Sequence, residues 1–144
     1  MAITQALPNS FKKQLLDGDQ DFSSAGGDKF KLALYVSTAT LGASTTSYTT
    51  SGEVSSSGTG YTTGGKALVN SGTSVVSTVA FTDFADLSFQ SVTLTARGCL
   101  IYNTSFSNSA VAVLNFGADK TATSGTFTIQ FPAFTSSAAI IRIS

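Results

Sequence analysis

The chain has 144 residues, and its eight basic and eight acidic residues, 11% of the total, balance to a net charge of zero. Because a typical soluble domain carries about 25% charged residues, most of the polarity here comes from 22 serines and 21 threonines, which predicts a neutral, hydroxyl-rich surface. The lack of histidine and the single cysteine exclude Ser-His-Asp and Cys-His catalytic sites, His-centred zinc sites and an internal disulfide.

Charge and hydropathy also limit the partners that we expect. The only basic cluster is Lys12-Lys13, so the chain lacks the electrostatic attraction that dominates binding to nucleic acids and anionic membranes. Residues 1–10 have neither the charged nor the long apolar region of a secretory signal, and no apolar run approaches the roughly 18 residues of a membrane span. We therefore expect a soluble protein made in a cytoplasm, without nucleic-acid or membrane partners.

One short helix is predicted near the N-terminus. Leu7, Phe11 and Leu15 lie at i, i+4 and i+8 and form one apolar stripe. Pro8 suits the first helical turn, and Gly18 is a natural stop. A helix of about two to three turns must dock against the rest of the protein to be stable.

Short apolar segments with the period of a β-strand fill the chain after residue 29. From Phe30 to Val36, apolar residues alternate with less apolar ones, which predicts a strand with one apolar face. Residues 37–51 form a long polar connection, and the glycine-rich residues 58–65 form a turn. Further short strands are predicted at 53–57, 66–70, 74–81 and 87–89, with a turn at 83–86.

The last third of the chain predicts a hairpin and two more strands. Residues 92–102 and 110–116 are apolar and flank the polar turn 103–108. Residues 117–125 are predicted to be a polar loop, and residues 126–131 and 140–143 to be strands. About seven or eight strands with turns between them predict a mainly β protein, an antiparallel sandwich or jelly-roll-like barrel with one short N-terminal helix.

The length predicts a single β-rich domain over residues 1–144. Residues 1–28 provide the helix and its connection, and residues 29–144 provide the β core. Within that core, Arg97 and Arg142 interrupt apolar segments. Because a buried charge is costly unless it is paired, we expect each arginine to face solvent or to pair with an aspartate, for which the candidates are Asp83, Asp86 and Asp119.

Four aspartates after the helix are the one candidate metal site. Asp17, Asp19 and Asp21 alternate, and Asp28 is the twelfth residue counted from Asp17, which is the spacing of a calcium-binding loop. The match is poor, because the sixth position is Phe22 where that loop needs glycine and the last ligand is aspartate instead of glutamate. A solvated connection is the favoured interpretation, calcium is the alternative, and no other metal or cofactor is expected.

Other motifs that carry chemistry are incomplete. In the glycine-rich segment, Lys66 is followed by Ala67 where a phosphate-binding loop needs serine or threonine. Asp83 and Asp86 would be the carboxylate pair of a glycosidase, yet two acids in one loop are more often a solvated turn. We therefore do not expect an enzyme.

Seven segments resemble a family of small virion structural proteins of tailed bacteriophages, and among these the chain looks most like a capsid decoration, or cement, protein. The segments are spread over nearly the whole chain. They are NSFK (9–12), FKLALY (30–35), GEV (52–54), GTGYTTGG (58–65), TARGCLIYN (95–103), NFG (115–117) and GTFTIQFP (125–132).

The resemblance implies a β-rich module on the outer surface of the phage head. It implies a homo-oligomer, a dimer or trimer, that stabilises the capsid by bridging neighbouring major capsid subunits, and that is made in the host cytoplasm. Our candidates for protein contacts are Phe11 and Lys12 in the helix, Tyr48 in the long connection, and Tyr61, because long loops in small domains are often functional.

A tail or fibre adhesin that binds a host-surface glycan is the alternative function. Four tyrosines, if exposed, would stack on sugar rings, although tyrosines in β proteins more often complete the edge of a core. They are Tyr35, Tyr48, Tyr61 and Tyr102.

Overall fold

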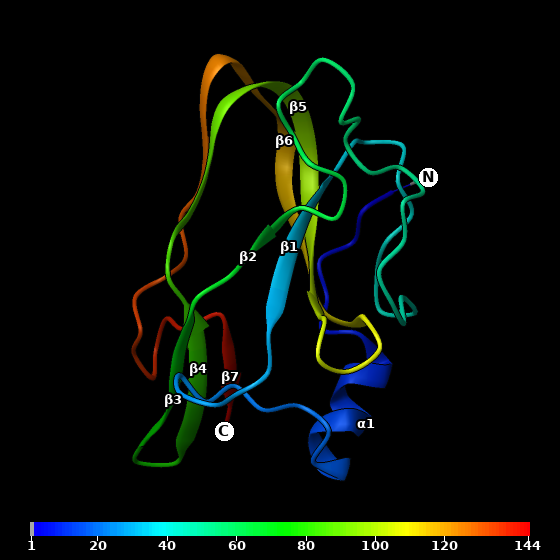
Figure 1. The fold of residues 1–144 in the computed structure, drawn as a ribbon. Coiled ribbons are helices and arrows are strands. Elements are labelled where there is room, and N and C mark those ends of the chain that lie inside the picture. The colour runs from blue at the N-terminus through cyan, green and yellow to red at the C-terminus, as the bar shows by residue number, and fades with distance from the viewer. Residues whose placement is uncertain (1) are drawn as a thin grey trace.

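Two antiparallel sheets and one short helix make up the fold (Figure 1), which we describe from a computed structural model covering residues 2–144. Strands and isolated β-bridges together hold 47% of the residues and the helix 6%, so the predicted mainly β class with a short N-terminal helix is confirmed. The elements are α1 (Asn9–Asp17), β1 (Phe30–Tyr35), β2 (Lys66–Ala67), β3 (Asn70–Val76), β4 (Val79–Phe84), β5 (Leu87–Asn103), β6 (Ser109–Ile129) and β7 (Ile141–Ile143).

The two sheets differ in size, and the long strand β5 of the larger sheet has different partners along its length. One has the strand order β2-β1-β5-β6 and the other the order β3-β4-β7. Residues 98–103 of β5 pair with both β1 and β6, whereas residues 87–96 pair with β6 alone. This second part of the β5–β6 ribbon arches over the top of the molecule and descends towards the three-stranded sheet (Figure 1).

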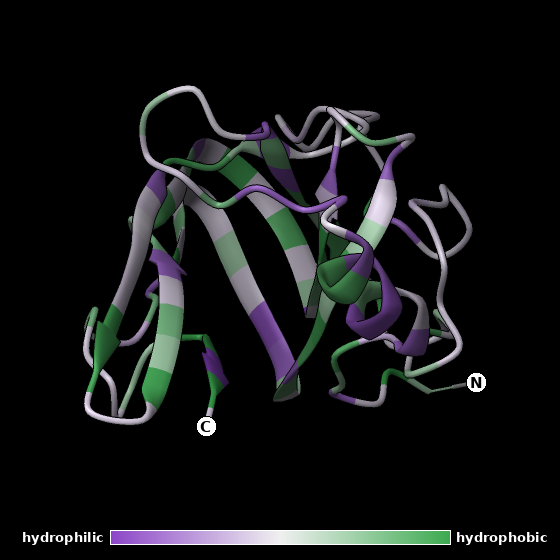
Figure 2. Cartoon of the chain, turned by 90° about the horizontal axis from the view of Figure 1, so that it is seen from below, coloured by the Kyte–Doolittle hydropathy of each residue, from purple (hydrophilic) through white to green (hydrophobic). Residues whose placement is uncertain are grey.

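The core lies under this arch because the ribbon has one apolar side. In β5, Val92, Leu94 and Ala96 are buried while Thr93 and Thr95 between them are exposed, which is the alternation of a half-buried strand. The same banding of apolar and polar residues is visible along the strands in Figure 2.

A chain of aromatic contacts joins α1 to both sheets. Phe11 of α1 meets Phe22 edge to face with 6.0 Å between ring centroids, and Phe22 stacks on Phe30 of β1 at 4.7 Å. Phe30 in turn meets Phe84 of β4 at 5.5 Å. The predicted helix therefore docks through Phe11, as its apolar stripe requires. No helix of the described residues is long and apolar enough to cross a membrane.

The helix ends where the sequence predicts. Gly18 has φ 80°, and the N–H groups of Gly18 and Asp19 donate to the carbonyl groups of Leu15 and Gln14. These bonds satisfy carbonyls that the last turn would otherwise leave free.

Several predicted boundaries are wrong. Residues 74–81 are not one strand, because a turn at Ser77 separates β3 from β4, and Ser77 adopts φ 55° without being glycine. Residues 117–125 are not a loop but part of β6, which absorbs Gly117 (φ 84°) through a register shift opposite residues 96–98. Residues 87–89 and 92–102 are one strand, β5. Residues 53–57 form no strand, and only Glu53 bridges to Tyr35.

Candidate interaction surface

Glu53, the one glutamate of the chain, organises the loops beside β1. The hydroxyl of Tyr48 donates to Oε1 of Glu53 at 2.6 Å, and the hydroxyl of Tyr61 donates to Oε2 at 2.6 Å. The backbone N–H of Gly64 donates to the same Oε2 at 2.7 Å. Three donors thus converge on one carboxylate, and two of them come from tyrosines predicted to contact a partner.

The other two tyrosines extend this network. Tyr102 stacks on Tyr48 with 4.6 Å between the rings and donates its hydroxyl to the carbonyl of Gly64 at 2.6 Å. Tyr35 donates to the carbonyl of Thr49 at 2.6 Å. Burial raises the pKa of Tyr102 to about 12, and the negative charge of Glu53 contributes to the increase. Every tyrosine hydroxyl is therefore a donor to protein, and the network fixes residues 48–64 against β1 and β5.

The structure places most predicted contact residues inside the protein. Phe11 is fully buried and Tyr61 is 2% exposed, so neither presents its side chain to a partner, and these two predictions are wrong. Lys12 is exposed and Tyr48 is half-buried. Tyr35 and Tyr102 are also buried, so the tyrosines do not form the exposed platform that glycan stacking requires.

The four aspartates of the candidate calcium loop do not converge. Asp17 pairs with Lys13 at 2.6 Å, and Asp21 accepts hydrogen bonds from Ser23. Asp28 accepts from the N–H of Asp21 at 3.0 Å and from Asn103, the buried asparagine, at 2.7 Å. Asp19 is half-buried. In residues 2–144, no three His, Cys, Asp or Glu side chains are grouped to hold a metal ion. Asp21 and Asp28 instead close the loop through backbone and amide donors.

Asp83 and Asp86 hold backbone groups separately. Asp83 is 1% exposed and its Oδ1 accepts from the N–H of Phe84 at 2.9 Å, whereas its Oδ2 has no protein partner. Burial raises the pKa of the Asp83 carboxyl above its ordinary value. Asp86 accepts from the N–H of Phe131 at 2.8 Å. Each carboxylate thus fixes a strand end.

Exposed apolar side chains gather at the three-stranded sheet. Among the described residues, six large apolar side chains are exposed, and Leu16 of α1 is the only one away from this sheet. The other five form what we term the apolar region: Val69 (67% exposed), Val75 (65%), Val76 (52%), Phe134 (42%) and Ile143 (55%).

Strand register explains how this region is built. Val75 of β3 lies opposite Ala80 of β4, which lies opposite Ile143 of β7. Residues opposite one another point to the same face of a sheet, so these three make one apolar row. Phe134 packs edge to face on Phe81 of β4 with 5.1 Å between the rings, and because Phe81 follows Ala80 in the strand, Phe134 lies on the opposite face of the sheet from this row. Val69 immediately precedes β3, and its carbonyl accepts from the N–H of Ala85 after β4.

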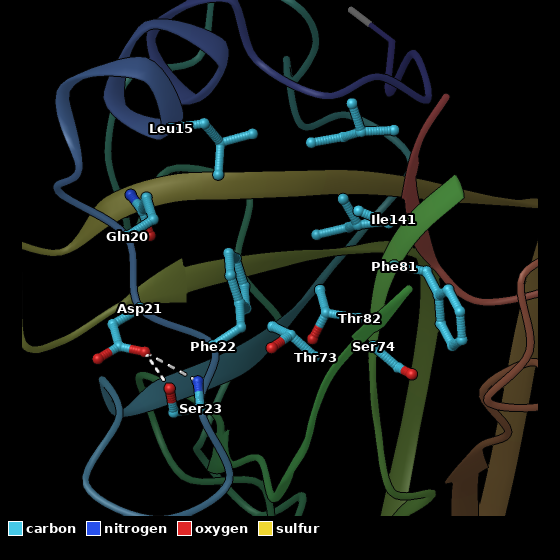
Figure 3. A pocket seen from close by; sticks show the side chains of 12 residues that line it. Leu15, Gln20, Asp21, Phe22, Ser23, Thr73, Ser74, Phe81, Thr82 and Ile141 are labelled. Carbon is cyan, nitrogen blue, oxygen red and sulfur yellow. Dashed lines mark hydrogen bonds between the residues drawn. The ribbon is translucent and has the colours of Figure 1, made fainter. Parts of the chain in front are cut away.

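A shallow groove lies beside the apolar row. It separates α1 from the three-stranded sheet, with a cavity volume of about 280 Å³. Leu15 lines one side, Phe22 the floor, and Thr82 and Ile141 the other side (Figure 3). Ala80 and Ile143 belong to both the groove and the row, so the groove adjoins the row.

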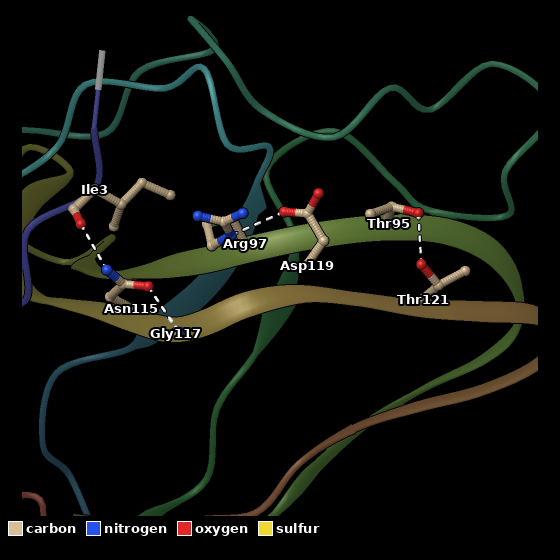
Figure 4. A network of polar contacts seen from close by, with 7 residues as sticks. All are labelled: Ile3, Thr95, Arg97, Asn115, Gly117, Asp119 and Thr121. Atoms are coloured by element: carbon tan, nitrogen blue, oxygen red, sulfur yellow. Dashed lines mark hydrogen bonds and ion pairs between the residues drawn. The ribbon is translucent and has the colours of Figure 1, made fainter.

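The outer side of the β5–β6 ribbon is covered with hydroxyl groups. Thr95 and Thr121 share a hydrogen bond across the strands at 2.8 Å. Beside them Arg97 pairs with Asp119 at 2.8 Å (Figure 4). One predicted partner of Arg97 is thereby confirmed, while Arg142 is exposed on β7. The ribbon thus presents the neutral polar surface expected from the composition.

The sequence interpretation missed the apolar region. The pattern predicts one strand over residues 74–81, whereas Val75 and Val76 end β3 and Val79 begins β4. The available signal is the pair Ser77-Thr78 between two valine-containing segments.

Comparison with family models, with curated proteins and with solved structures gives no match to this chain.

Proposed function

We propose that this chain is a virion structural protein of a tailed bacteriophage that decorates the outer surface of the head. It stabilises the capsid by bridging neighbouring major capsid subunits, as a homo-oligomer. The observation that carries the proposal is the apolar region, because five of the six large exposed apolar side chains lie at one sheet. Apolar groups gathered on a protein surface are typical of protein-binding sites.

Two further features support a passive binding role. The chain as a whole has no net charge and is rich in hydroxyl groups, whose hydrogen bonds are less sensitive to salt than ion pairs. The Glu53 network fixes the long loops, so little conformational freedom is lost on binding. A protein attached to the shell at several points needs only moderate affinity at each point. Once one contact has formed, the next forms within the same complex, at a high effective concentration.

Attachment to capsid shells tests the proposal. The labelled chain is mixed with expanded heads assembled from the major capsid protein encoded with it, and the particles are imaged by electron microscopy. We expect density for the chain on the outside of the shell, between neighbouring subunits. Ile143→Ser removes apolar area from the row and should weaken attachment about fivefold or more, whereas Leu16→Ser, the matched control on α1, should not.

Two results would contradict the proposal. One is the absence of the chain from heads at saturating concentration, and the other is equal attachment of wild type and Ile143→Ser. Specific binding of the isolated chain on a glycan array, without attachment to heads, would favour the adhesin instead.

A further inference from the structure

Each sheet ends in two outermost strands, β2 and β6 in one and β3 and β7 in the other, and the outer edges of three of these four strands are protected. A free edge presents unpaired N–H and C=O groups, which proteins protect with short strands, charges, bulges or covering segments. β2 has two residues and carries Lys66, and β7 has three residues with Arg142 in the middle. Both are short and charged, so neither is a suitable template for another strand.

The edge of β6 is covered by the N-terminal segment and then charged. Ala6 and Val113 exchange two backbone hydrogen bonds, of 3.0 and 2.9 Å, and the side chain of Asn115 donates to the carbonyl of Ile3 at 2.8 Å (Figure 4). Farther along the strand the edge carries Asp119 and Lys120, and register shifts interrupt the pairing of β6 with β5 between residues 115 and 120 and between residues 122 and 127. This edge is therefore protected along both parts.

The edge of β3 is protected only in its first half. The side chain of Asn70 donates to the carbonyls of Ser23 and Asp28, each at 3.1 Å, and a β-bulge follows between Asn70 and Gly72. The second half, residues 73–76, is exposed, and no other segment of residues 2–144 pairs with its outer side. From residue 71 to residue 82 the chain has no charge and no proline.

We infer that a second copy of this chain pairs with residues 73–76 of β3, antiparallel and across a two-fold axis. In such a symmetric contact each surface meets its own copy, so a charge near the axis would face the same charge on the other copy. β3 has none, whereas β2, β6 and β7 each have at least one. The pair forms a six-stranded sheet that joins the two apolar rows.

The size of this contact predicts a weak dimer. Four residues of strand extend about 14 Å, and the exposed side chains of Val75 and Val76 from both copies add apolar area. The contact is smaller than a standard interface, which places it among transient associations. On a shell, where each copy is also held by capsid subunits, the same contact is strengthened by effective concentration.

The contact deepens the proposed function by naming how the homo-oligomer is made, and the isolated chain tests it separately. Sedimentation equilibrium over about 10 µM to 1 mM should show a monomer–dimer equilibrium. Val75→Lys places a charge on each side of the axis and should raise the dissociation constant tenfold or more. Leu16→Lys, which makes the same kind of change on α1, should leave it unchanged. Circular dichroism verifies that both variants are folded.

Single cysteines give a second, geometric test. Cys99 is fully buried, so a new cysteine is the one accessible thiol. Under mild oxidation we expect disulfide-linked dimers from one or two of Thr73→Cys, Ser74→Cys, Val75→Cys and Val76→Cys, because only residues near the axis meet their own copy. Leu16→Cys is the control for random collision.

A chain that stays monomeric, or a dimer that Val75→Lys does not weaken, would overturn the inference, as would cross-linking no faster than that of the control. If the chain is monomeric but Val75→Lys abolishes attachment to heads, a capsid strand occupies the edge; the inference is then wrong while the proposed function stands.

Discussion

Glu53 gives the clearest prediction for a single side chain. Glu53→Gln replaces a charged acceptor by an amide whose NH₂ group faces a donor, either Tyr48 or the pair Tyr61 and Gly64. Hydrogen bonds to charged groups contribute about 1.5–3 kcal/mol each, and an unsatisfied donor adds a penalty. We expect urea denaturation to show a loss of about 2 kcal/mol or more in the free energy of unfolding.

Two tyrosine variants act as controls for this loss. Tyr48→Phe removes one donor from a half-buried site, whereas Tyr61→Phe also leaves the buried N–H of Leu34 without its acceptor, 3.0 Å away. Tyr61→Phe should therefore cost more stability than Tyr48→Phe. Equal losses for all three variants would show that the carboxylate is not the centre of the network.

The buried carboxyl of Asp83 predicts that the stability of the fold depends on pH. Burial raises its pKa in the folded state, so the stability that the protonated group contributes is lost as pH rises through that folded pKa. Asp83→Asn removes the charge, and the variant should be more stable than wild type at about pH 7, by more than at about pH 4, where protonation of the wild-type carboxyl makes the two more alike. Urea denaturation at the two pH values measures this difference, and an equal effect at both would contradict it.

The Glu53 network could not be predicted from the sequence. Tyr48, Tyr61 and Gly64 lie five, eight and eleven residues from Glu53. No strand or helix period brings such positions together, because the contacts depend on how an irregular loop folds on β1. The composition offers one signal, because the chain has a single glutamate and four tyrosines but few other charged residues.

Within the glycine-rich turn, two positions should respond very differently to alanine. Gly65 and Gly58 have similar dihedral angles, φ +81° and +71°, but a Cβ on Gly65 would overlap the backbone carbonyl of Leu32 in β1, whereas a Cβ on Gly58 would meet nothing within 4 Å. Gly58→Ala should cost about 1 kcal/mol, from the dihedral angle alone. Gly65→Ala should cost about 3 kcal/mol or more, because β1 must move. Thermal unfolding of the pair measures both, and similar losses would contradict the close approach.

The predicted elements were correct where the hydrophobic period was long and unbroken. Helix α1, β1 and the hairpin around residues 103–108 all follow from their patterns. The ends of β3, β4 and β6 could not be predicted from the same signals. Ser77 makes its turn without glycine or proline, and Gly117 bends β6 without ending it. Both depend on contacts across the sheets, which override local preference.

At the scale of the whole molecule, the four tyrosines predict alkaline unfolding. Their pKa values are raised in the folded state, to about 12 for Tyr102, because of burial and of the charge of Glu53. The unfolded chain therefore loses protons above about pH 10 that the folded chain keeps. Stability should fall between about pH 10 and 12, by up to about 1.4 kcal/mol per pH unit for each tyrosine.

Tyrosinate absorbance and circular dichroism, recorded together across that range, measure this effect. The two signals should change at the same pH, because the hydroxyls ionise when the fold opens. Ionisation of all four tyrosines near pH 10, with the fold intact, would contradict the network. Tyr102→Phe should make the loss of stability with pH less steep.

The order of pairing along the chain has a consequence for synthesis. β1 pairs with β5, and the N-terminal segment pairs with β6 at Val113, more than a hundred residues after Ala6. As the chain leaves the ribosome, α1 and β1 emerge without the strands that cover them, and the β5–β6 ribbon forms only after its turn at 103–108 has appeared. Folding of the larger sheet must therefore wait until most of the chain has been translated.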